Sequence, residues 1–291
     1  MNQQSSKWRT TGISNNFMFR LVMERPELCK RLIEIVLDIK IKTLTYLEPE
    51  KNLEAKLASK GVRLDIYAED DAGNIFDIEM QADDKNKAHL GKRIRYYQSM
   101  LDTDTLKKRE LYSKLRKSVI IFICSFDPFD KGFGKYTFSH LCHEDTTVSL
   151  NDEAKAVFIN VLGDKHRVTR ELANLMEYIS GGDPMDEYTA ALDQTVKKLQ
   201  NDDGSEALYM TWEQTILEER EYAREEGRAE GKAEGRAEGR AEGKAEGRAE
   251  GKAEGKLDTL KGLVKEGLIS IAIAAQKAGM TEDAFKKIAC L

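Results

Sequence analysis

The chain is poor in cysteine and has no long apolar run. Its four cysteines, Cys29, Cys124, Cys142 and Cys290, are widely spaced and form no C-x-x-C motif. This spacing argues against a disulfide framework and is typical of proteins in a reducing compartment, so we expect a cytoplasmic protein. No segment approaches the roughly 18–20 apolar residues of a membrane span, and the N-terminus lacks an apolar signal core. We therefore expect no membrane contact.

A large excess of charge of one sign is also absent. The net charge is −5 over 291 residues, although a third of the residues are charged. The overall sign therefore does not indicate nucleic-acid binding, and any basic surface must be local. The length is sufficient for one large or two small domains with a proper core.

Periodicity predicts a mixed α/β order for the first 200 residues. An apolar stripe predicts helix over 14–38, capped by Ser14 or Asn15 and interrupted at Pro26. The following segments are predicted as strands (42–47, 118–126, 136–142 and 156–162) and as helices (86–103, 165–180, 184–200 and 206–226).

The segment 61–81, GVRLDIYAEDDAGNIFDIEMQ, has the alternating pattern of two half-buried strands joined by a turn. One face of this hairpin is apolar. The other face carries four polar side chains, namely Asp65, Asp77, Glu79 and Gln81. Acids gathered on one sheet face repel one another unless a cation lies among them. The array therefore suggests a divalent-metal site.

Asp65 and Glu79 are the candidate ligands, together with the backbone carbonyl of Met80 and water. Such a set suits octahedral Mg²⁺ (or Mn²⁺), which polarises a phosphodiester and activates water. Asp77 is interpreted as a neighbour that either tunes the site or faces solvent. We expect no small-molecule cofactor.

An acid, a turn and then E-x-K on the paired strand is the PD-(D/E)XK nuclease pattern, and here Gln81 stands at the lysine position. The resemblance extends over roughly residues 10–190 and includes three later segments, KRIRYYQSMLD, VIIFICSFDPFDKGFGKYTFSHLCHED and AVFINVLG. This part of the sequence resembles the Rpn family of recombination-promoting nucleases, which are also described as transposases. The resemblance implies an αβββαβ core with a central mixed sheet flanked by helices. It also implies Mg²⁺-dependent DNA endonuclease activity in DNA recombination or mobility.

The resemblance assigns roles residue by residue. Asp65 and Glu79 match the metal acids, and Gln81 would orient the attacking water, because an amide supplies neither a cation nor a base. The missing positive charge would come from Lys92, Arg93 or Arg95 on the next helix, which we expect to contact DNA phosphates. Glu24 is a further candidate, at the helix acid that some members of the superfamily use.

Several alternatives remain open. Gln81 also allows a catalytically silent DNA-binding or oligomerisation protein built on a nuclease-like fold, and RNA could replace DNA as substrate. The basic run 107–117 could bind phosphates or simply be solvated. Tyr96 or Tyr97 could stack on a base or pack in the core. His140, Cys142 and His143 are poorly spaced for zinc.

The C-terminal third has a different composition. We divide the chain into a nuclease-like domain (1–200), a connecting helix (201–226), a tether or weak helix (227–256) and a small helical unit (257–291). The third segment includes seven Gly-Lys/Arg-Ala-Glu tetrapeptides, in which glycine weakens a helix and opposite charges never fall at i,i+3 or i,i+4. A dimerising coil would lack apolar a/d residues. In the last unit, Ala275, Gly279 and Phe285 have helix–turn–helix spacing, which a plain helical hairpin capped by Thr281 explains equally well. A homo-oligomer is a further expectation for this tail.

Overall fold

The computed structural model describes residues 7–53, 61–85 and 87–290. Two compact units divide the chain, the first ending at Trp212 and the second beginning at Glu213. Helix α7 (Asp203–Lys265) runs across this boundary.

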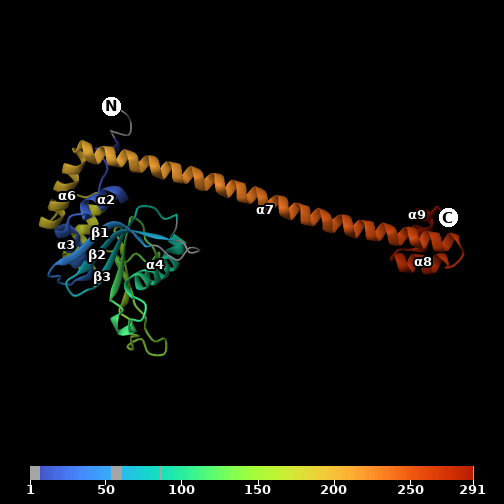
Figure 1. Cartoon of the computed structure of the whole chain (residues 1–291), viewed down its shortest axis with the longest axis horizontal. Helices are drawn as coiled ribbons and strands as arrows, with labels where there is room; N and C mark the ends of the chain where they lie inside the picture. Colours follow the sequence, from blue (N-terminus) through green and yellow to red (C-terminus); the bar gives the residue numbers. More distant parts are fainter. Residues whose placement is uncertain (1–6, 54–60, 86, 291) are drawn as a thin grey trace. The chain divides into compact units, whose positions relative to one another are not determined.

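The first unit is built on a six-stranded mixed sheet with the strand order β1-β2-β3-β4-β6-β5 (Figure 1). Neighbouring strands are antiparallel except for β3 with β4 and β4 with β6, which are parallel. The strands are β1 (Leu44–Leu53), β2 (Val62–Asp70), β3 (Ile75–Gln81), β4 (Ser118–Cys124), β5 (Lys135–Phe138) and β6 (Ala154–Asn160). The order of helix, three strands, helix and strand that the sequence predicts is therefore confirmed.

The first strand is longer than the predicted 42–47 and continues through Pro49. Because β1 lies at the edge of the sheet, a residue without an N–H group can be placed there without losing a hydrogen bond that the sheet needs. The sequence-based prediction placed the end of the strand before this proline. At the edge of the sheet, the missing N–H group of proline does not prevent the strand from continuing.

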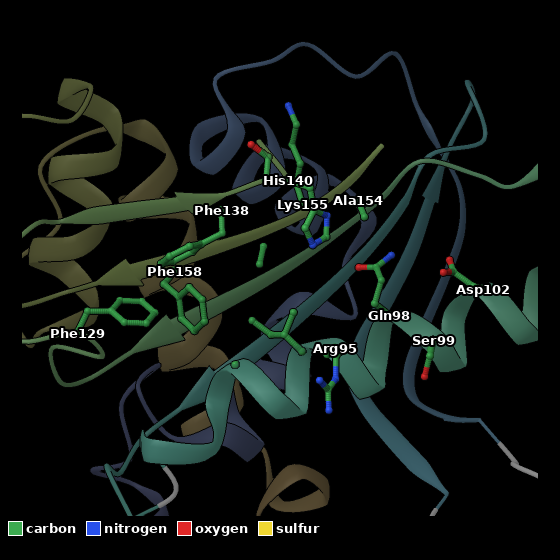
Figure 2. Close-up of a pocket in the computed structure, with 14 residues that line it drawn as sticks. Arg95, Gln98, Ser99, Asp102, Phe129, Phe138, His140, Ala154, Lys155 and Phe158 are labelled. Atoms are coloured by element: carbon green, nitrogen blue, oxygen red, sulfur yellow. The ribbon is translucent and has the colours of Figure 1, made fainter. Parts of the chain in front are cut away.

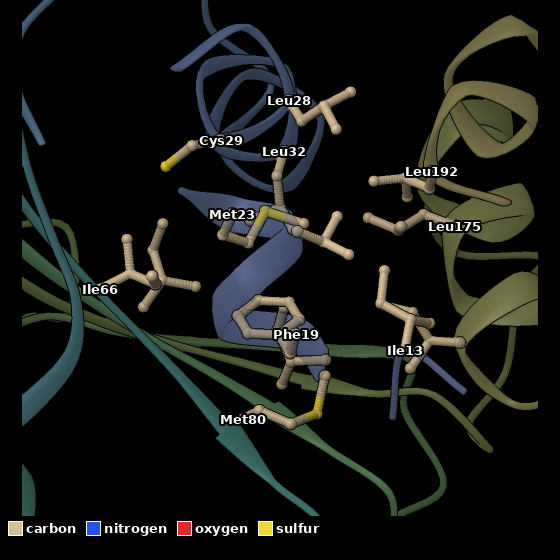
Figure 3. Packing of buried hydrophobic residues seen from close by; sticks show 14 of the residues in the cluster. Ile13, Phe19, Met23, Leu28, Cys29, Leu32, Ile66, Met80, Leu175 and Leu192 are labelled. Carbon is tan, nitrogen blue, oxygen red and sulfur yellow. The ribbon is translucent and has the colours of Figure 1, made fainter. Parts of the chain in front are cut away.

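One face of the sheet is covered by α2 (Asn16–Met23), α3 (Pro26–Leu37), α5 (Arg170–Ile179) and α6 (Glu187–Gln200). Pro26 occupies the first turn of α3, where its missing N–H costs nothing, and Asn15 caps α2 by accepting from the N–H groups of Phe17 and Met18. Figure 3 shows Phe19 of α2 packed between the helices and Met80 of β3. The start of α7 joins this core through Tyr209.

The opposite face is covered by α4 (Leu90–Thr105), which follows a short 3₁₀ turn (Lys87–His89). Leu90, Met100 and Leu101 of this helix pack in one cluster with Phe122 and Phe158 of the sheet. β3 is consequently buried on both faces, whereas the sequence predicted a half-buried strand. The acids of the hairpin thus lie beneath a helix, away from bulk solvent.

The second unit contains most of α7 and two short helices, α8 (Ile271–Ala278) and α9 (Glu282–Ala289). Ala275 and Phe285 are buried against Leu260 of α7, Gly279 adopts a left-handed conformation, and the Thr281 hydroxyl accepts from Ala284 N. The predicted capping role of Thr281 is confirmed.

The tetrapeptide repeat lies within α7 and is helical throughout, with no break at any glycine. Alanine, glutamate, lysine and arginine are the strongest helix formers and fill three of every four positions, which offsets the glycine cost of about 1 kcal/mol per residue. Within the described ranges, no helix has both the length and the apolarity needed to cross a membrane.

Candidate metal and nuclease site

The strands β2 and β3 separate just where the two candidate ligands lie. The last paired residues of this ladder are Ile66 and Ile78. Beyond them, the backbone N–H of Asp65 donates to Glu79 Oε1 at 2.9 Å, and the backbone N–H of Met80 donates to Asp65 Oδ2 at 3.2 Å. Each carboxylate therefore replaces part of the ladder, and the two are held side by side.

Arg93 extends from the first turns of α4 onto this pair. Its guanidinium forms an ion pair with Glu79 and donates to Gln81 Oε1 at 3.0 Å, while its Nε donates to Tyr97 Oη at 2.8 Å. The Gln81 amide in turn donates to the Met80 carbonyl at 3.1 Å. The helix after the hairpin thus supplies the expected positive charge: Arg93 lies beside the acids and is ion-paired with the Glu79 carboxylate.

The site holds more negative charge than one arginine neutralises. Burial, and next the charge of Asp65, raise the pKa of Glu79 to about 8. Burial also raises the pKa of Asp65, although the Met80 N–H and Arg93 oppose this. A group with these properties gains by binding an additional cation, because the cation stabilises the charged form.

Asp77 is the part of the site that the sequence left undecided. Its side chain is 0% exposed, so the alternative that it faces solvent is wrong. Burial, followed by the charges of Glu79 and Asp65, holds its pKa well above the usual range. In the described chain no donor reaches either of its oxygens, and a protonated Asp77 can itself donate to Glu79. Asp77 is therefore a buried neighbour of the two candidate ligands, and its raised pKa favours the protonated form.

This donor set fits a hard divalent cation, which takes oxygen ligands from carboxylates, backbone carbonyls and water. Asp65, Glu79 and the Met80 carbonyl supply three such groups at one place. No cluster of three or more His, Cys, Asp or Glu side chains suited to a metal occurs in the described residues. The candidate site therefore depends on two carboxylates and a carbonyl, as the sequence suggested.

The other candidates lie further away or have other partners. Lys92 and Arg95 are exposed on α4. Glu24 ends α2, where its strongest charged neighbours are Arg20, Arg25 and Glu50. The predicted core alternative for Tyr97 is correct in part, since this residue packs against the sheet cluster while binding Arg93.

Two further side chains act on the site in ways that the sequence did not predict. Tyr97 positions Arg93, and Glu50 of β1 adds negative charge near Asp65. Tyr97 lies four residues after Arg93, one helical turn away, which is a signal that the sequence did contain. Glu50 reaches the site only through the β1–β2 pairing, which no local pattern reveals.

The zinc alternative finds no support in the part of the chain that is described. His140 Nδ1 is 2.6 Å from Asp152 Oδ2, and the Cys142 thiol donates to Glu144. These side chains have carboxylate partners in the loop between β5 and β6, and they do not converge.

Comparison with known proteins identifies a family. The family model for PD-(D/E)XK nuclease family transposases matches residues 14–232, which is most of the chain and includes β2, β3 and α4. Neither the curated proteins nor the solved structures contain a match. The matched segment carries the paired acids, the fork between their strands and the helix that supplies Arg93, and on this basis the chain belongs to the PD-(D/E)XK nuclease family transposases.

Proposed function

We propose that this protein is a metal-dependent DNA endonuclease that acts in DNA recombination or mobility in the cytoplasm. The observation that carries the proposal is the placement of Asp65 and Glu79 across the fork between β2 and β3, each bound to the backbone N–H of the opposite strand. Membership of a nuclease family supports the same reaction class.

Asp65, Glu79 and the Met80 carbonyl would hold Mg²⁺ or Mn²⁺. When bound, the ion would polarise the phosphodiester and lower the pKa of a water molecule. Gln81 then acts as a positioning residue: its amide links the Met80 carbonyl to Arg93 and leaves donor capacity for the attacking water. Arg93 offsets the charge of Glu79, and Lys92 and Arg95 on the exposed side of α4 would contact neighbouring phosphates.

Nicking of supercoiled plasmid tests the proposal. The full chain is incubated with Mg²⁺, Mn²⁺ or EDTA and compared with Asp65→Asn and Glu79→Gln. We expect nicking in either metal, none in EDTA, and a loss of at least a hundredfold in both variants. Asp71→Asn is the matched control, because it lies in the turn of the same hairpin and retains the oxygen that accepts from Thr43 N. Equal cleavage by the native chain and both site variants would overturn the assignment.

A second candidate is a catalytically silent DNA-binding or oligomerisation protein. The observation that favours it is the Arg93–Glu79 ion pair, which satisfies one ligand internally, together with glutamine at position 81. In that case the plasmid stays intact in every metal, while duplex DNA still binds and the affinity falls when residues 227–291 are deleted. Single-stranded RNA in place of DNA in the same assay distinguishes the two substrate classes.

A further inference from the structure

The loop between α4 and β4, residues 106–117, concentrates positive charge in a chain whose net charge is −5. We call it the basic loop, because it holds six basic residues and one acid. In the described part of the chain, no ion pair includes four of its exposed cations, Lys107, Lys108, Arg109 and Lys114. Like charges that lie together without partners repel one another, so the loop gains free energy when an anion binds.

Two other charged residues hold the basic loop in place. Arg116 is ion-paired with Glu69 of β2 at 2.7 Å, and its Nε donates to the Gly73 carbonyl at 2.6 Å. The Glu110 carboxylate accepts from the backbone N–H of Lys107 at 2.7 Å, which closes a turn. The loop is therefore fixed to the β2–β3 hairpin. Its free cations are presented from an ordered backbone, which lowers the entropy cost of binding.

Two features of the basic loop are typical of a binding surface. Leu111 is 72% exposed and Tyr112 is 88% exposed, beside the free cations. Arg109 has a φ of 78°, in the left-handed region where a residue other than glycine is strained. Strain of this kind concentrates where a protein binds a ligand, because the surrounding structure must hold it.

A face of α4 without carboxylates leads to the basic loop. The face consists of exposed residues at helical spacing, namely Lys92, Arg95, Ser99 and Thr103. Figure 2 shows the side chains of Arg95 and Ser99 on this face. Asp102 points to the other side, where a groove lies beside Phe138, between α4, β5 and β6. The charge of Asp104 is offset by an ion pair with Lys51 of β1. The face is therefore positive at its start and neutral further on, and it ends at the basic loop.

The length of this surface suits a DNA duplex. Twelve residues separate Arg95 from Lys107, which is about 18 Å at the helical rise of about 1.5 Å per residue. Successive phosphates of one DNA strand are about 3.4 Å apart along the helix axis, so this length spans about five base pairs. A duplex that contacts Arg95 can therefore contact the basic loop as well.

We propose that the basic loop, together with this face of α4, binds the phosphate backbone of double-stranded DNA. The proposal rests on the proposed function only in taking DNA as the ligand. Lys107, Lys108, Arg109 and Lys114 contact phosphates through their charges, and the Tyr112 hydroxyl donates to a phosphate oxygen. These contacts hold the duplex in place along α4 and carry no sequence information.

An anionic membrane is the rival ligand for a loop with these charges. Segments that bind at a membrane surface are amphipathic helices with an extended apolar face. The helical part of the basic loop is instead a three-residue 3₁₀ turn, Tyr112–Lys114. Its charge continues along α4 in a line, as the linear backbone of a duplex requires.

Binding is measured in EDTA, so that cleavage plays no part. Fluorescence anisotropy follows the titration of the full chain into a fluorescein-labelled duplex at several potassium chloride concentrations. Lys108→Gln/Lys114→Gln removes two charges from the basic loop, and Tyr112→Phe removes a neutral donor. Arg170→Gln/Lys198→Gln is the matched control, because both residues are exposed and form no ion pair in the described chain. They belong to α5 and α6, on the opposite face of the sheet from α4. Circular dichroism checks the fold of each variant.

The salt dependence gives the sharpest result. Each phosphate contact contributes about 0.9 to the slope of log affinity against log salt concentration. We expect the slope for Lys108→Gln/Lys114→Gln to be shallower by about 1.8, since two contacts are lost. Tyr112→Phe should weaken binding about tenfold and leave the slope unchanged, because the lost donor is neutral. The Arg170→Gln/Lys198→Gln control should bind as the native chain does.

A native slope in Lys108→Gln/Lys114→Gln would overturn the proposal. An equal loss in the Arg170→Gln/Lys198→Gln control would also overturn it, because the effect would then belong to the net charge. Sedimentation with vesicles of phosphatidylserine and phosphatidylcholine tests the membrane. Loss of vesicle binding in the loop variant, with unchanged affinity for the duplex, would assign the loop to a membrane and overturn the proposal.

The same variants separate this proposal from the endonuclease proposal. If the loop variant has the shallower slope but the native chain cuts no plasmid, the binding surface stands and the endonuclease proposal fails. If the native chain nicks plasmid while the loop variant binds the duplex with the native slope, the endonuclease proposal stands and the binding surface fails.

Discussion

Arg93 of α4 is ion-paired with Glu79 of β3, and this contact brings a cation to the acids from a helix. The strand position that holds lysine in the PD-(D/E)XK pattern is Gln81, which accepts a hydrogen bond from the same guanidinium at 3.0 Å. The two residues together place a positive charge and an amide at the site.

Replacing Arg93 by glutamine should destabilise the chain in EDTA. Removal of one partner from a buried ion pair typically costs about 3–5 kcal/mol. Glu79 can take up a proton, so the loss should be smaller at pH 6 than at pH 9. Urea unfolding at both pH values measures this difference. Arg95→Gln, two residues further along the same helix and exposed, should leave the unfolding free energy unchanged.

Replacing Gln81 by alanine should lower the nicking rate by about a hundredfold, at the lower end of the effect of positioned groups in proton transfer. The change removes the link between Arg93 and the Met80 carbonyl without removing a metal ligand. The apparent metal affinity should therefore change less than the rate. Single-turnover nicking over a range of Mn²⁺ concentrations separates the two quantities. An equal rate at saturating metal would show that Gln81 does not position the reaction.

The metal affinity should depend steeply on pH. The pKa of Glu79 is raised to about 8 by burial and by Asp65, so a proton must leave before a cation binds there. The affinity should rise about tenfold per pH unit up to pH 8 and level off above it. Without metal, the raised pKa of Glu79 means that the folded chain holds its proton more tightly than the unfolded chain does. The free energy of unfolding of the metal-free chain should therefore fall as the pH rises through about 8. Thermal melts at pH 6 and pH 9, with and without Mn²⁺, should show both trends.

The two exchanges Asp77→Asn and Asp77→Ala should behave differently. Asparagine keeps a donor toward Glu79, so the pH dependence of metal affinity should stay close to native. In the native chain, the hydrogen bond from Asp77 lowers the pKa of Glu79. Alanine removes this donor, so the pKa of Glu79 should rise and the pH profile of metal affinity should shift to higher pH. Isothermal titration with Mn²⁺ measures both. Complete loss of binding in Asp77→Asn would instead identify Asp77 as a ligand.

Alanine at Gly235, Gly239 and Gly243 should stabilise α7. A side chain at each position meets no atom within 4 Å, and the exchange should contribute about 1 kcal/mol per residue. Thermal melts followed at 222 nm should show the helix persisting to higher temperature. Gly279→Ala is the contrasting variant, because its φ of +73° disfavours a side chain, and it should destabilise α8 and α9. Unchanged melts for the triple variant would contradict the helix.

The alternation over 61–81 was sufficient to place Asp65, Glu79 and Gln81 on one face of a hairpin, because side-chain direction in a strand is local information. The strand order of the first unit follows the same logic for β1 to β3, which are consecutive neighbours. The break at Pro26 was also predictable, since proline restricts the backbone at its own position.

The burial of this hairpin face could not be read locally. It depends on α4 packing across the sheet. A polar strand face beneath a helix and a solvent-exposed polar strand face have the same sequence pattern. The groove beside Phe138 likewise brings together α4, β5 and β6, whose contacts span long sequence separations. A helix over the repeats was one of the two predicted alternatives; the tether was kept beside it because the glycine cost was weighed against the helix propensity of the residues between the glycines.

A lysine on a strand would be fixed by the hydrogen bonds of the sheet. Arg93 is carried by α4, which is joined to the sheet by side-chain packing, so its position can change while the ladder stays intact. A bound ligand or a mutation that slides α4 by an ångström or two would withdraw the cation from Glu79 without unfolding the hairpin. Under the proposed nuclease function, such a shift would lower activity while the hairpin stays folded.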